Sequence, residues 1–147
     1  MQTPDLTIRS LRSTAVSVPM ARPLGTSAQT IRTASLLLID LETEQGVTGR
    51  TYLFCYMPMA SELIARVLDE LLVLIKGDRV APLEITTKLG QKFRLVGATG
   101  VISMALAGLD AACWDALAVA AGVPLVNFLG GARKAVPAYN SNGLGLM

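Results

Sequence analysis

Hydrophobic and polar positions alternate along the first third of the chain, as in β-strands that bury one face. A turn that contains Gly46, at a position suited to positive φ, separates the last two alternating segments. A different stretch, residues 21–33, is rich in Gly, Pro, Ser and Thr and predicts a loop. The pattern therefore predicts an antiparallel meander of three strands, at residues 6–20, 35–42 and 47–56.

From Pro58 the spacing of apolar residues changes to the three-to-four period of an α-helix. Charged residues lie opposite one apolar face, which is expected to hold Leu63, Val67, Leu71 and Leu74. Gly77 ends this helix, and Pro82 fits the first turn of a second helix that runs to about Arg94. A glycine-containing break at residues 97–100 then precedes the most apolar part of the chain.

The stretch from Met104 to Gly131 is rich in alanine and contains two acids, Asp110 and Asp115. The uncharged residues 95–109 are shorter than the roughly 20 residues that a membrane span needs. A longer span would include both acids, at roughly 2.5–3.5 kcal/mol each at the bilayer centre. A core helix therefore fits better, followed by Gly122 at the C′ position and by a short helix after Pro124. Its buried side is expected to hold Ile102, Ala105, Leu109, Ala112 and Ala116.

Asp110 and Asp115 do not form a close catalytic pair on such a helix. The five-residue step between them rotates the helix by about 500°, which leaves the two side chains roughly 140° apart. Acids are kept in protein interiors when they have hydrogen-bonding partners. We therefore interpret each aspartate as a hydrogen-bonded structural acid.

Composition narrows the possible functions. With 52% apolar and 16% charged residues the chain is expected to fold. A net charge of +2 and 5% aromatic residues do not indicate a nucleic-acid-binding surface. The 147 residues include no histidine, which excludes Ser-His-Asp and Cys-His catalysis within them. Cys55 and Cys113 match neither a disulfide framework nor a zinc motif. No apolar signal segment opens the sequence, so we expect a cytoplasmic protein that binds no membrane.

Residues 105–130 carry a long motif, A-L-A-G-L-D-A-A-C-W-D-A-L-A followed by P-L-V-N-F-L-G. The motif resembles the first signature of the mandelate racemase/muconate lactonizing enzyme group of the enolase superfamily. The match consists of small residues, two acids and two dipeptides at the family's spacing: Ala107, Gly108, Asp110, Asp115, Pro124-Leu125 and Leu129-Gly130. Three positions depart from the family pattern: Cys113, Val119 and Phe128. Residues 50–58 and 92–100 resemble the mandelate racemase branch, so the resemblance covers nearly the whole chain.

The resemblance implies an α+β fold, with residues 1–132 as an N-terminal capping domain: a three-stranded antiparallel sheet followed by a helical bundle. Residues 133–147 would begin a C-terminal (β/α) barrel, whose first strand is expected at Val136 to Asn142. In the family the barrel carries a Lys-x-Lys base motif, three acidic Mg²⁺ ligands and a His-Asp base. None of these motifs is present in the sequence. We therefore expect a truncated fragment with no catalytic residue and no bound metal.

The family reaction begins with removal of a proton α to a carboxylate, and Mg²⁺ and a lysine stabilise the resulting enediolate. The full-length enzyme is therefore expected to need Mg²⁺ and to racemise a 2-hydroxy acid or dehydrate an acid sugar. Its capping domain would be a lid that excludes water and contributes to specificity, and its partners would be its own barrel and further copies in a homo-oligomer. The alternative is a stand-alone, non-catalytic interaction module with the same fold.

Matching to the family assigns four substrate-contacting positions: Leu24, Ile31, Tyr56 and Ser141. Leu24 and Ile31 fall in the expected lid loop, residues 23–33, where packing of the loop on the core explains them equally well. For Tyr56 the alternative is packing on the sheet. Ser141 is expected at the C-terminal end of the first barrel strand, where barrel active sites are built.

Polar residues around these positions leave the substrate open. An apolar lid favours an aryl or alkyl 2-hydroxy acid, whereas Arg22, Gln29 and Arg32 leave room for a polyhydroxy acid sugar. Asn140 and Asn142 stand where mandelate racemase is expected to have Asp and His. The sequence therefore predicts a carboxylate substrate without choosing between these two classes.

Overall fold

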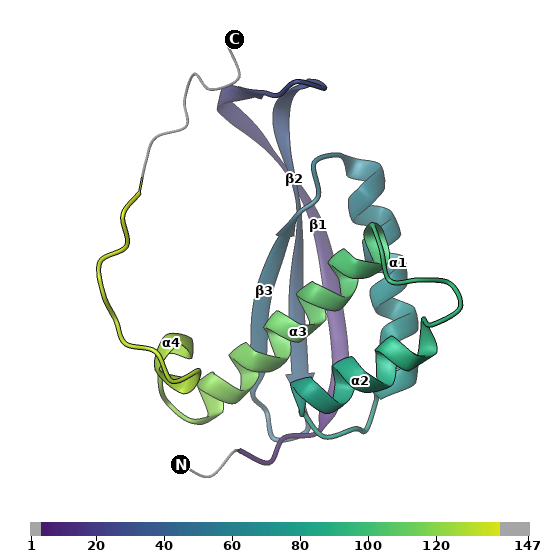
Figure 1. The fold of residues 1–147 in the computed structure, drawn as a ribbon, viewed down its shortest axis with the longest axis vertical. Coiled ribbons are helices and arrows are strands. Elements are labelled where there is room, and N and C mark those ends of the chain that lie inside the picture. Colours follow the sequence, from purple (N-terminus) through teal and green to yellow (C-terminus); the bar gives the residue numbers. More distant parts are fainter. Residues whose placement is uncertain (1–3, 139–147) are drawn as a thin grey trace.

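One antiparallel sheet forms the centre of the computed structural model, which describes residues 4–138 (Figure 1). Its strands are β1 (Ile8–Gly25), β2 (Thr30–Thr43) and β3 (Thr48–Phe54), in the order β1-β2-β3. Gly46 has a φ of 78° in the turn between β2 and β3, as predicted. The hydroxyl of Thr43 closes that turn, because it donates to the Val47 carbonyl at 2.9 Å and accepts from the Val47 N–H at 3.0 Å. The predicted meander is confirmed.

Helices follow the strands and cover one face of the sheet (Figure 1). They are α1 (Pro58–Ile75), α2 (Pro82–Lys92), α3 (Val101–Ala120) and the single turn α4 (Leu125–Phe128). Proline occupies the first turn of α1 and of α2, where its missing N–H costs nothing. The order of strands, then helices, confirms the predicted α+β fold.

The buried face of α1 differs from the predicted one. Leu71 is buried as predicted, but Leu63 is 48% exposed and the buried face contains Ile64 and Leu68 instead. Apolar residues also lie elsewhere around this helix, among them Val73, so spacing alone does not choose the face. Packing against β1 and α3 makes the choice.

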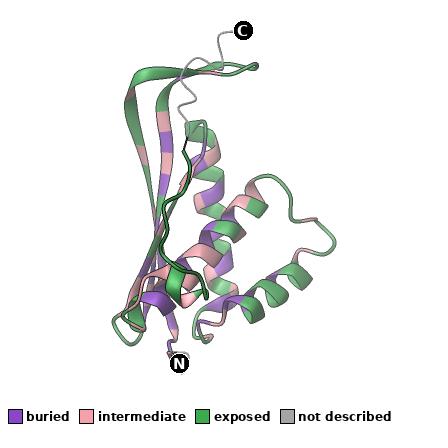
Figure 2. Ribbon diagram, turned by 60° about the vertical axis from the view of Figure 1, so that its left-hand side comes forward, coloured by how far each residue is buried: buried purple, intermediate pink, exposed green. Residues whose placement is uncertain are grey.

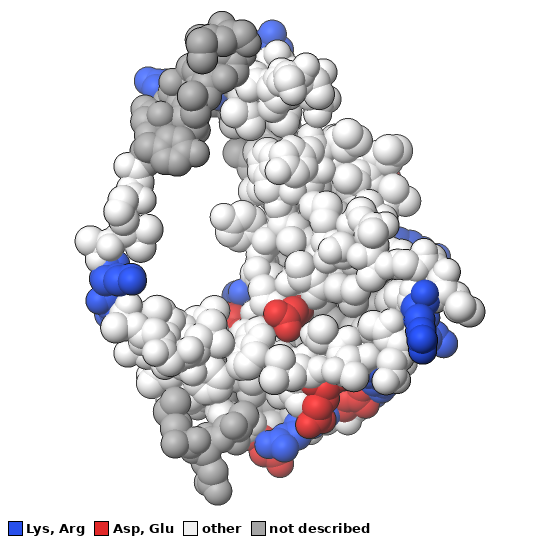
Figure 3. All heavy atoms as spheres, viewed as in Figure 1, with Lys and Arg blue, Asp and Glu red and all other residues white. Residues whose placement is uncertain are grey.

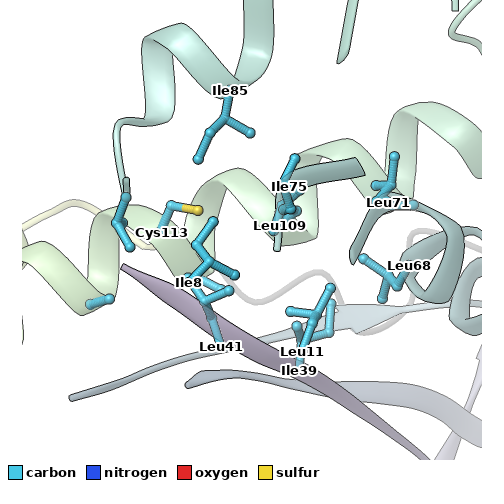
Figure 4. Packing of buried hydrophobic residues seen from close by; sticks show 14 of the residues in the cluster. Ile8, Leu11, Ile39, Leu41, Leu68, Leu71, Ile75, Ile85, Leu109 and Cys113 are labelled. Atoms are coloured by element: carbon cyan, nitrogen blue, oxygen red, sulfur yellow. The ribbon is translucent and has the colours of Figure 1, made fainter. Parts of the chain in front are cut away.

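Small residues let α3 lie directly on the sheet. A Cβ atom at Gly49 of β3 would overlap the carbonyl oxygen of Ala112, and one at Gly108 would lie 2.6 Å from Ile39 Cδ1. Ala112 and Ala116 of α3 are fully buried at this contact. The contact is the start of a hydrophobic core that continues through Ile8, Leu41, Leu68, Leu71, Ile75 and Leu109 (Figure 4).

Length and composition alone would allow α3 to cross a membrane. In the fold, however, the helix contacts β2, β3, α1 and α2, and its Leu109 and Leu117 are each 1% exposed. A helix that is apolar nearly all round is expected in a protein core as well as in a bilayer. The structure supports α3 as a core helix.

After α4 the chain leaves the helices. Residues 131–138 are exposed, have no regular secondary structure and run away from the body of the domain (Figures 1 and 2). Val136, the predicted first residue of a barrel strand, is 76% exposed and is not in a strand. Residues 139–142 of that predicted strand lie outside the described residues, and so does Ser141.

Candidate functional site

The β1–β2 hairpin extends well beyond β3. The last residue of β3, Phe54, pairs with Leu36, and Leu36 pairs in turn with Val16 of β1. Past this level only two strands continue, and residues 19–33 form what we call the hairpin end. The hairpin end therefore projects from the sheet, with the third strand absent on one side.

The predicted loop at residues 21–33 is wrong for most of its length, because β1 continues to Gly25 and β2 begins at Thr30. Pro19 pairs with Thr33 and Leu24 with Ile31, so the register shifts between them. Such a bulge bends a strand and increases its twist. Pro19 and Pro23 flank the shift, and neither has an N–H for a ladder hydrogen bond. The ribbon accordingly folds over at its tip (Figure 2).

Thr26 holds the tip in one shape. Its N–H and its hydroxyl both donate to the Gln29 carbonyl, at 2.9 and 2.7 Å. The same hydroxyl oxygen accepts from the N–H of Gln29 at 3.0 Å. The four-residue turn is therefore closed by its own side chain, in the manner of Ser/Thr turns.

Leu24 and Ile31 are brought together as cross-strand partners behind this turn. Directly opposed side chains on an antiparallel ladder have Cβ atoms about 4.5–5.5 Å apart, so the two form one apolar unit. Leu24 is 40% exposed, whereas Ile31 is 6% exposed although it lies outside the main hydrophobic cluster. Leu24 therefore gives the hairpin end an exposed apolar surface, and Ile31 supports it from the paired strand.

Among residues 4–138, Tyr56 is the one residue other than glycine with a positive φ, which is 63°. The N–H of Met57 donates to the Cys55 carbonyl at 2.7 Å, which closes a three-residue γ-turn around Tyr56. Turns of this hand are rare and strained. The Tyr56 ring is 56% exposed and stands edge-to-face against Phe54, with ring centroids 4.8 Å apart. The strained backbone therefore holds an aromatic ring at the surface.

The predicted substrate-contacting residues lie at two levels of the sheet. The N–H of Cys55 donates to the Ser35 carbonyl at 2.8 Å, which places Tyr56 beside Ser35. Ile31 is four residues further along β2, or about 13 Å of strand. The structure thus joins Leu24 to Ile31 and places Tyr56 at the base of the hairpin end. Phe54, two residues before Tyr56, packs against the Tyr56 ring and was not among the predicted residues.

The hairpin end carries exposed polar side chains, two of them basic. Arg22, Gln29 and Arg32 are exposed, and no ion pair of either arginine occurs within residues 4–138. Acidic side chains on the face in Figure 3 gather in the lower half of the molecule, away from the hairpin end. Such a distribution attracts anions to the tip over a Debye length of about 8–10 Å.

Asp110 and Asp115 point to different neighbours, as the predicted 140° separation requires. A carboxylate oxygen of Asp115 accepts a hydrogen bond from the backbone N–H of Arg50 at 2.7 Å, which ties α3 to β3. The structural role expected for Asp115 is confirmed. The same expectation for Asp110 is wrong among the described residues: its side chain lies against a cavity between α2 and α3 and has no hydrogen bond or ion pair there.

Neither cysteine serves as a nucleophile in the described structure. Both are free and buried, and Cys113 has no exposed surface. Burial, with a smaller contribution from the nearby Asp110 charge, raises the pKa of the Cys113 thiol to about 12. The thiol therefore stays protonated and unreactive at neutral pH.

Residues 4–138 also offer no metal site, because no group of three His, Cys, Asp or Glu side chains lies close enough to hold an ion. Mg²⁺ in proteins relies on carboxylate ligands and near-octahedral geometry. The described residues do not fit it, and no reaction step through magnesium is assigned to them.

The fold and these residues agree with a known domain. Residues 8–130 match the family described as mandelate racemase/muconate lactonizing enzyme, N-terminal domain. The chain belongs to this family. Its members of known structure include an enolase from Bradyrhizobium complexed with magnesium and mandelic acid, which is 39% identical with a TM-score of 0.86. An enolase from alpha proteobacterium bal199 with bound magnesium is 42% identical, with a TM-score of 0.89.

The chain is much shorter than these relatives. The alignments cover 95% and 97% of this chain but 38% and 39% of the Bradyrhizobium and bal199 chains. L-talarate/galactarate dehydratase of Salmonella typhimurium LT2 is 40% identical over 60 residues, which are 41% of this chain and 15% of the dehydratase. The similarity therefore concerns the N-terminal domain of longer enzymes of the mandelate racemase/muconate lactonizing enzyme family.

Proposed function

We propose that this chain is the capping part of a Mg²⁺-dependent enzyme that removes a proton α to the carboxylate of a 2-hydroxy acid or acid sugar. In this proposal residues 1–132 are the cap and residues 133–147 lead into a barrel that carries the catalytic groups and the metal. The observation that carries the proposal is the hairpin end, a bent ribbon with a closed tip that exposes Leu24 outside the core and pairs it with a buried Ile31.

The apolar pair has a defined task in this proposal. When the hairpin end closes over a barrel mouth, the exposed Leu24 displaces water from the reacting centre, and the buried Ile31 holds Leu24 in place. Exclusion of water strengthens the electrostatic interactions that stabilise negative charge as the proton leaves. The same surface selects for the distal group of the substrate, because an apolar pair favours an aryl or alkyl group over a hydroxylated one.

Charge contributes to substrate capture. Arg22 and Arg32 form no ion pair with other described residues. They belong to the hairpin end, whereas the acids on the face in Figure 3 gather in the lower half of the molecule. They are therefore available to attract a carboxylate before the lid closes. Tyr56, held outward by its γ-turn, adds an aromatic edge at the base of the hairpin end, and Ser141 is proposed to contact the substrate carboxylate from the barrel side.

The relatives give this chemistry a specific first test. One relative was solved with magnesium and mandelic acid, and another is a talarate/galactarate dehydratase. A chimera of residues 1–132 of this chain with the barrel of the Bradyrhizobium relative should bind mandelate in the presence of Mg²⁺. It should also exchange the α-proton of mandelate with deuterium from solvent, which proton NMR measures directly.

Variants of the lid make the test specific. Leu24→Ala and Ile31→Ala each remove part of an apolar contact, so each should weaken mandelate binding by about fivefold, or about 1 kcal/mol. Leu83→Ala is the matched control, because Leu83 is 74% exposed on α2, away from the hairpin end. A well-folded chimera that neither binds mandelate nor exchanges its proton would refute the proposal. Equal effects of all three substitutions would refute the assigned lid residues.

A further inference from the structure

A partly open cavity of about 210 Å³ lies between α2 and α3. Its walls come from one stripe of each helix: Ile85 and Leu89 of α2, and Leu106 and Leu109 of α3. Ile85 points from α2 toward the part of α3 that carries Leu109 and Cys113 (Figure 4). An apolar cavity of about 150 Å³ is enough to bind benzene, so this one has room for a single-ring molecule.

Gly90 leaves one wall of this cavity open. It lies inside α2 and lines the cavity, and a Cβ atom at this position would meet nothing within 4 Å. Glycine inside a helix costs roughly 0.5–1 kcal/mol relative to alanine. Gly49 and Gly108 have a steric reason for lacking a side chain, because neighbouring atoms occupy the space. Gly90 has no such steric reason: it is exposed, and the space beside it is open, so a molecule in the cavity can approach the α2 backbone there.

Asp110 places a negative charge at the edge of the same cavity. It is half-buried among apolar side chains, one helical turn from Leu106 and from Cys113. Within residues 4–138 its carboxylate has no hydrogen-bond or ion-pair partner, in contrast to Asp115, which accepts from Arg50 N–H. A cation placed beside this carboxylate would form a charge-assisted hydrogen bond that the described residues do not supply.

We propose that the cavity between α2 and α3 binds a small organic cation, with one apolar ring inside and an ammonium group paired with Asp110. The chemistry follows from the cavity: its volume limits the body to one ring, its walls are apolar, and its one charged group is negative. The ligand class is opposite in charge to the carboxylate substrate proposed for the hairpin end. The proposal therefore concerns a second site and does not depend on the proposed activity.

Three ring compounds of similar size separate the contributions of shape and charge. Benzylammonium, toluene and benzoate are titrated into the whole chain, and the methyl NMR signals of Ile85 and Leu109 report the location. Benzylammonium should shift these signals saturably, about tenfold more tightly than toluene. Benzoate should be the weakest, because its charge is repelled by Asp110.

Two substitutions test the two parts of the site. Asp110→Asn keeps the shape and should lower benzylammonium affinity about tenfold, to the level of toluene, while toluene is unaffected. Gly90→Leu fills the cavity and should abolish the binding of both benzylammonium and toluene. Gly90→Ala should still bind both. Asp69→Asn, at an exposed acid of α1, is the charge control and should change nothing.

Circular dichroism melting shows that each variant is folded before it is titrated. The proposal is overturned if benzylammonium gives no saturable shift at millimolar concentration, or if Asp110→Asn binds it as well as the parent chain. Shifts that spread over the surface without involving Ile85 and Leu109 would also overturn it, since they indicate non-specific adsorption.

Discussion

Alanine substitution of three glycines tests how closely α3 packs on the sheet. At Gly49 a Cβ atom would overlap the Ala112 carbonyl oxygen and lie 2.7 Å from the Ala116 nitrogen. Both are backbone atoms, so no side-chain rotation relieves the clash and α3 itself must move. Overpacking a core costs roughly 1–3 kcal/mol, and a clash with backbone belongs at the upper end. We therefore expect Gly49→Ala to lower the free energy of unfolding by about 3 kcal/mol.

The other two glycines should respond differently to the same change. At Gly108 the nearest atom is the end of the Ile39 side chain, at 2.6 Å, and alanine gains about 1 kcal/mol of helix propensity. The net loss for Gly108→Ala should be about 1 kcal/mol. Gly90 has nothing within 4 Å of the Cβ position, so Gly90→Ala should raise stability by roughly 0.5–1 kcal/mol.

Urea unfolding followed by far-UV circular dichroism measures the change in the free energy of unfolding for all three variants, with the midpoint and the slope of each curve fitted separately. For a chain of this size 1 kcal/mol corresponds to roughly 4 °C in Tm, so Gly49→Ala should melt roughly 12 °C lower. If Gly49→Ala does not fold at all, the result also supports a tight contact between α3 and β3. The reasoning is refuted if Gly49→Ala and Gly90→Ala have the same sign, since a loose contact between α3 and β3 would treat them alike.

Three further predictions concern the single side chains of Asp115, Cys113 and Tyr56. Asp115→Ala leaves the Arg50 N–H without its partner and should cost about 1–2 kcal/mol in urea unfolding, whereas Asp69→Ala, in an exposed pair with a 4.0 Å separation, should cost less than about 0.5 kcal/mol. The pKa of the Cys113 thiol is raised to about 12 in the folded chain, so this thiol ionises first in the unfolded chain. Its contribution to the free energy of unfolding should be constant below about pH 9 and be lost between pH 9 and 12, so the parent chain should lose more stability than Cys113→Ala in that range. Equal pH dependence of the two chains in urea unfolding would contradict this. Tyr56→Gly relieves the positive φ and should unfold at higher urea than Tyr56→Ala, by about 1 kcal/mol; the reverse order would show that the turn is unstrained.

Local chemistry explains why most of the fold was predictable. Gly46 in its turn, proline at the start of α1 and α2, and Gly122 with a φ of 66° after α3 all act within a few residues of the chain. Their effect on the backbone does not depend on distant parts of the sequence. The angle of roughly 140° around the helix axis between Asp110 and Asp115 likewise depends on one helix alone, so the sequence predicts it.

The failures have a common cause in contacts between distant residues. The face of α1 that holds Leu63 is apolar, but the sheet and α3 select the neighbouring face instead. Residues 21–33 have the composition of a loop, yet their two ends pair with each other and extend the β1–β2 ladder, which is formed by more distant partners such as Leu11 and Leu41. Nor does the sequence show that Asp110 faces a cavity, since that depends on where α2 comes to lie.

The apolar character of α3 has a consequence for synthesis on the ribosome. A nascent helix that meets the length and composition of a bilayer span is also a target for the machinery that inserts membrane proteins. In this chain β1, β2, β3 and α1 all precede α3, so the surface that buries Leu109 and Leu117 is synthesised first. Domains fold largely from the N-terminus as they emerge, which gives α3 a protein surface to bind at once. Moving α3 ahead of the sheet by circular permutation would preserve every contact while removing that protection.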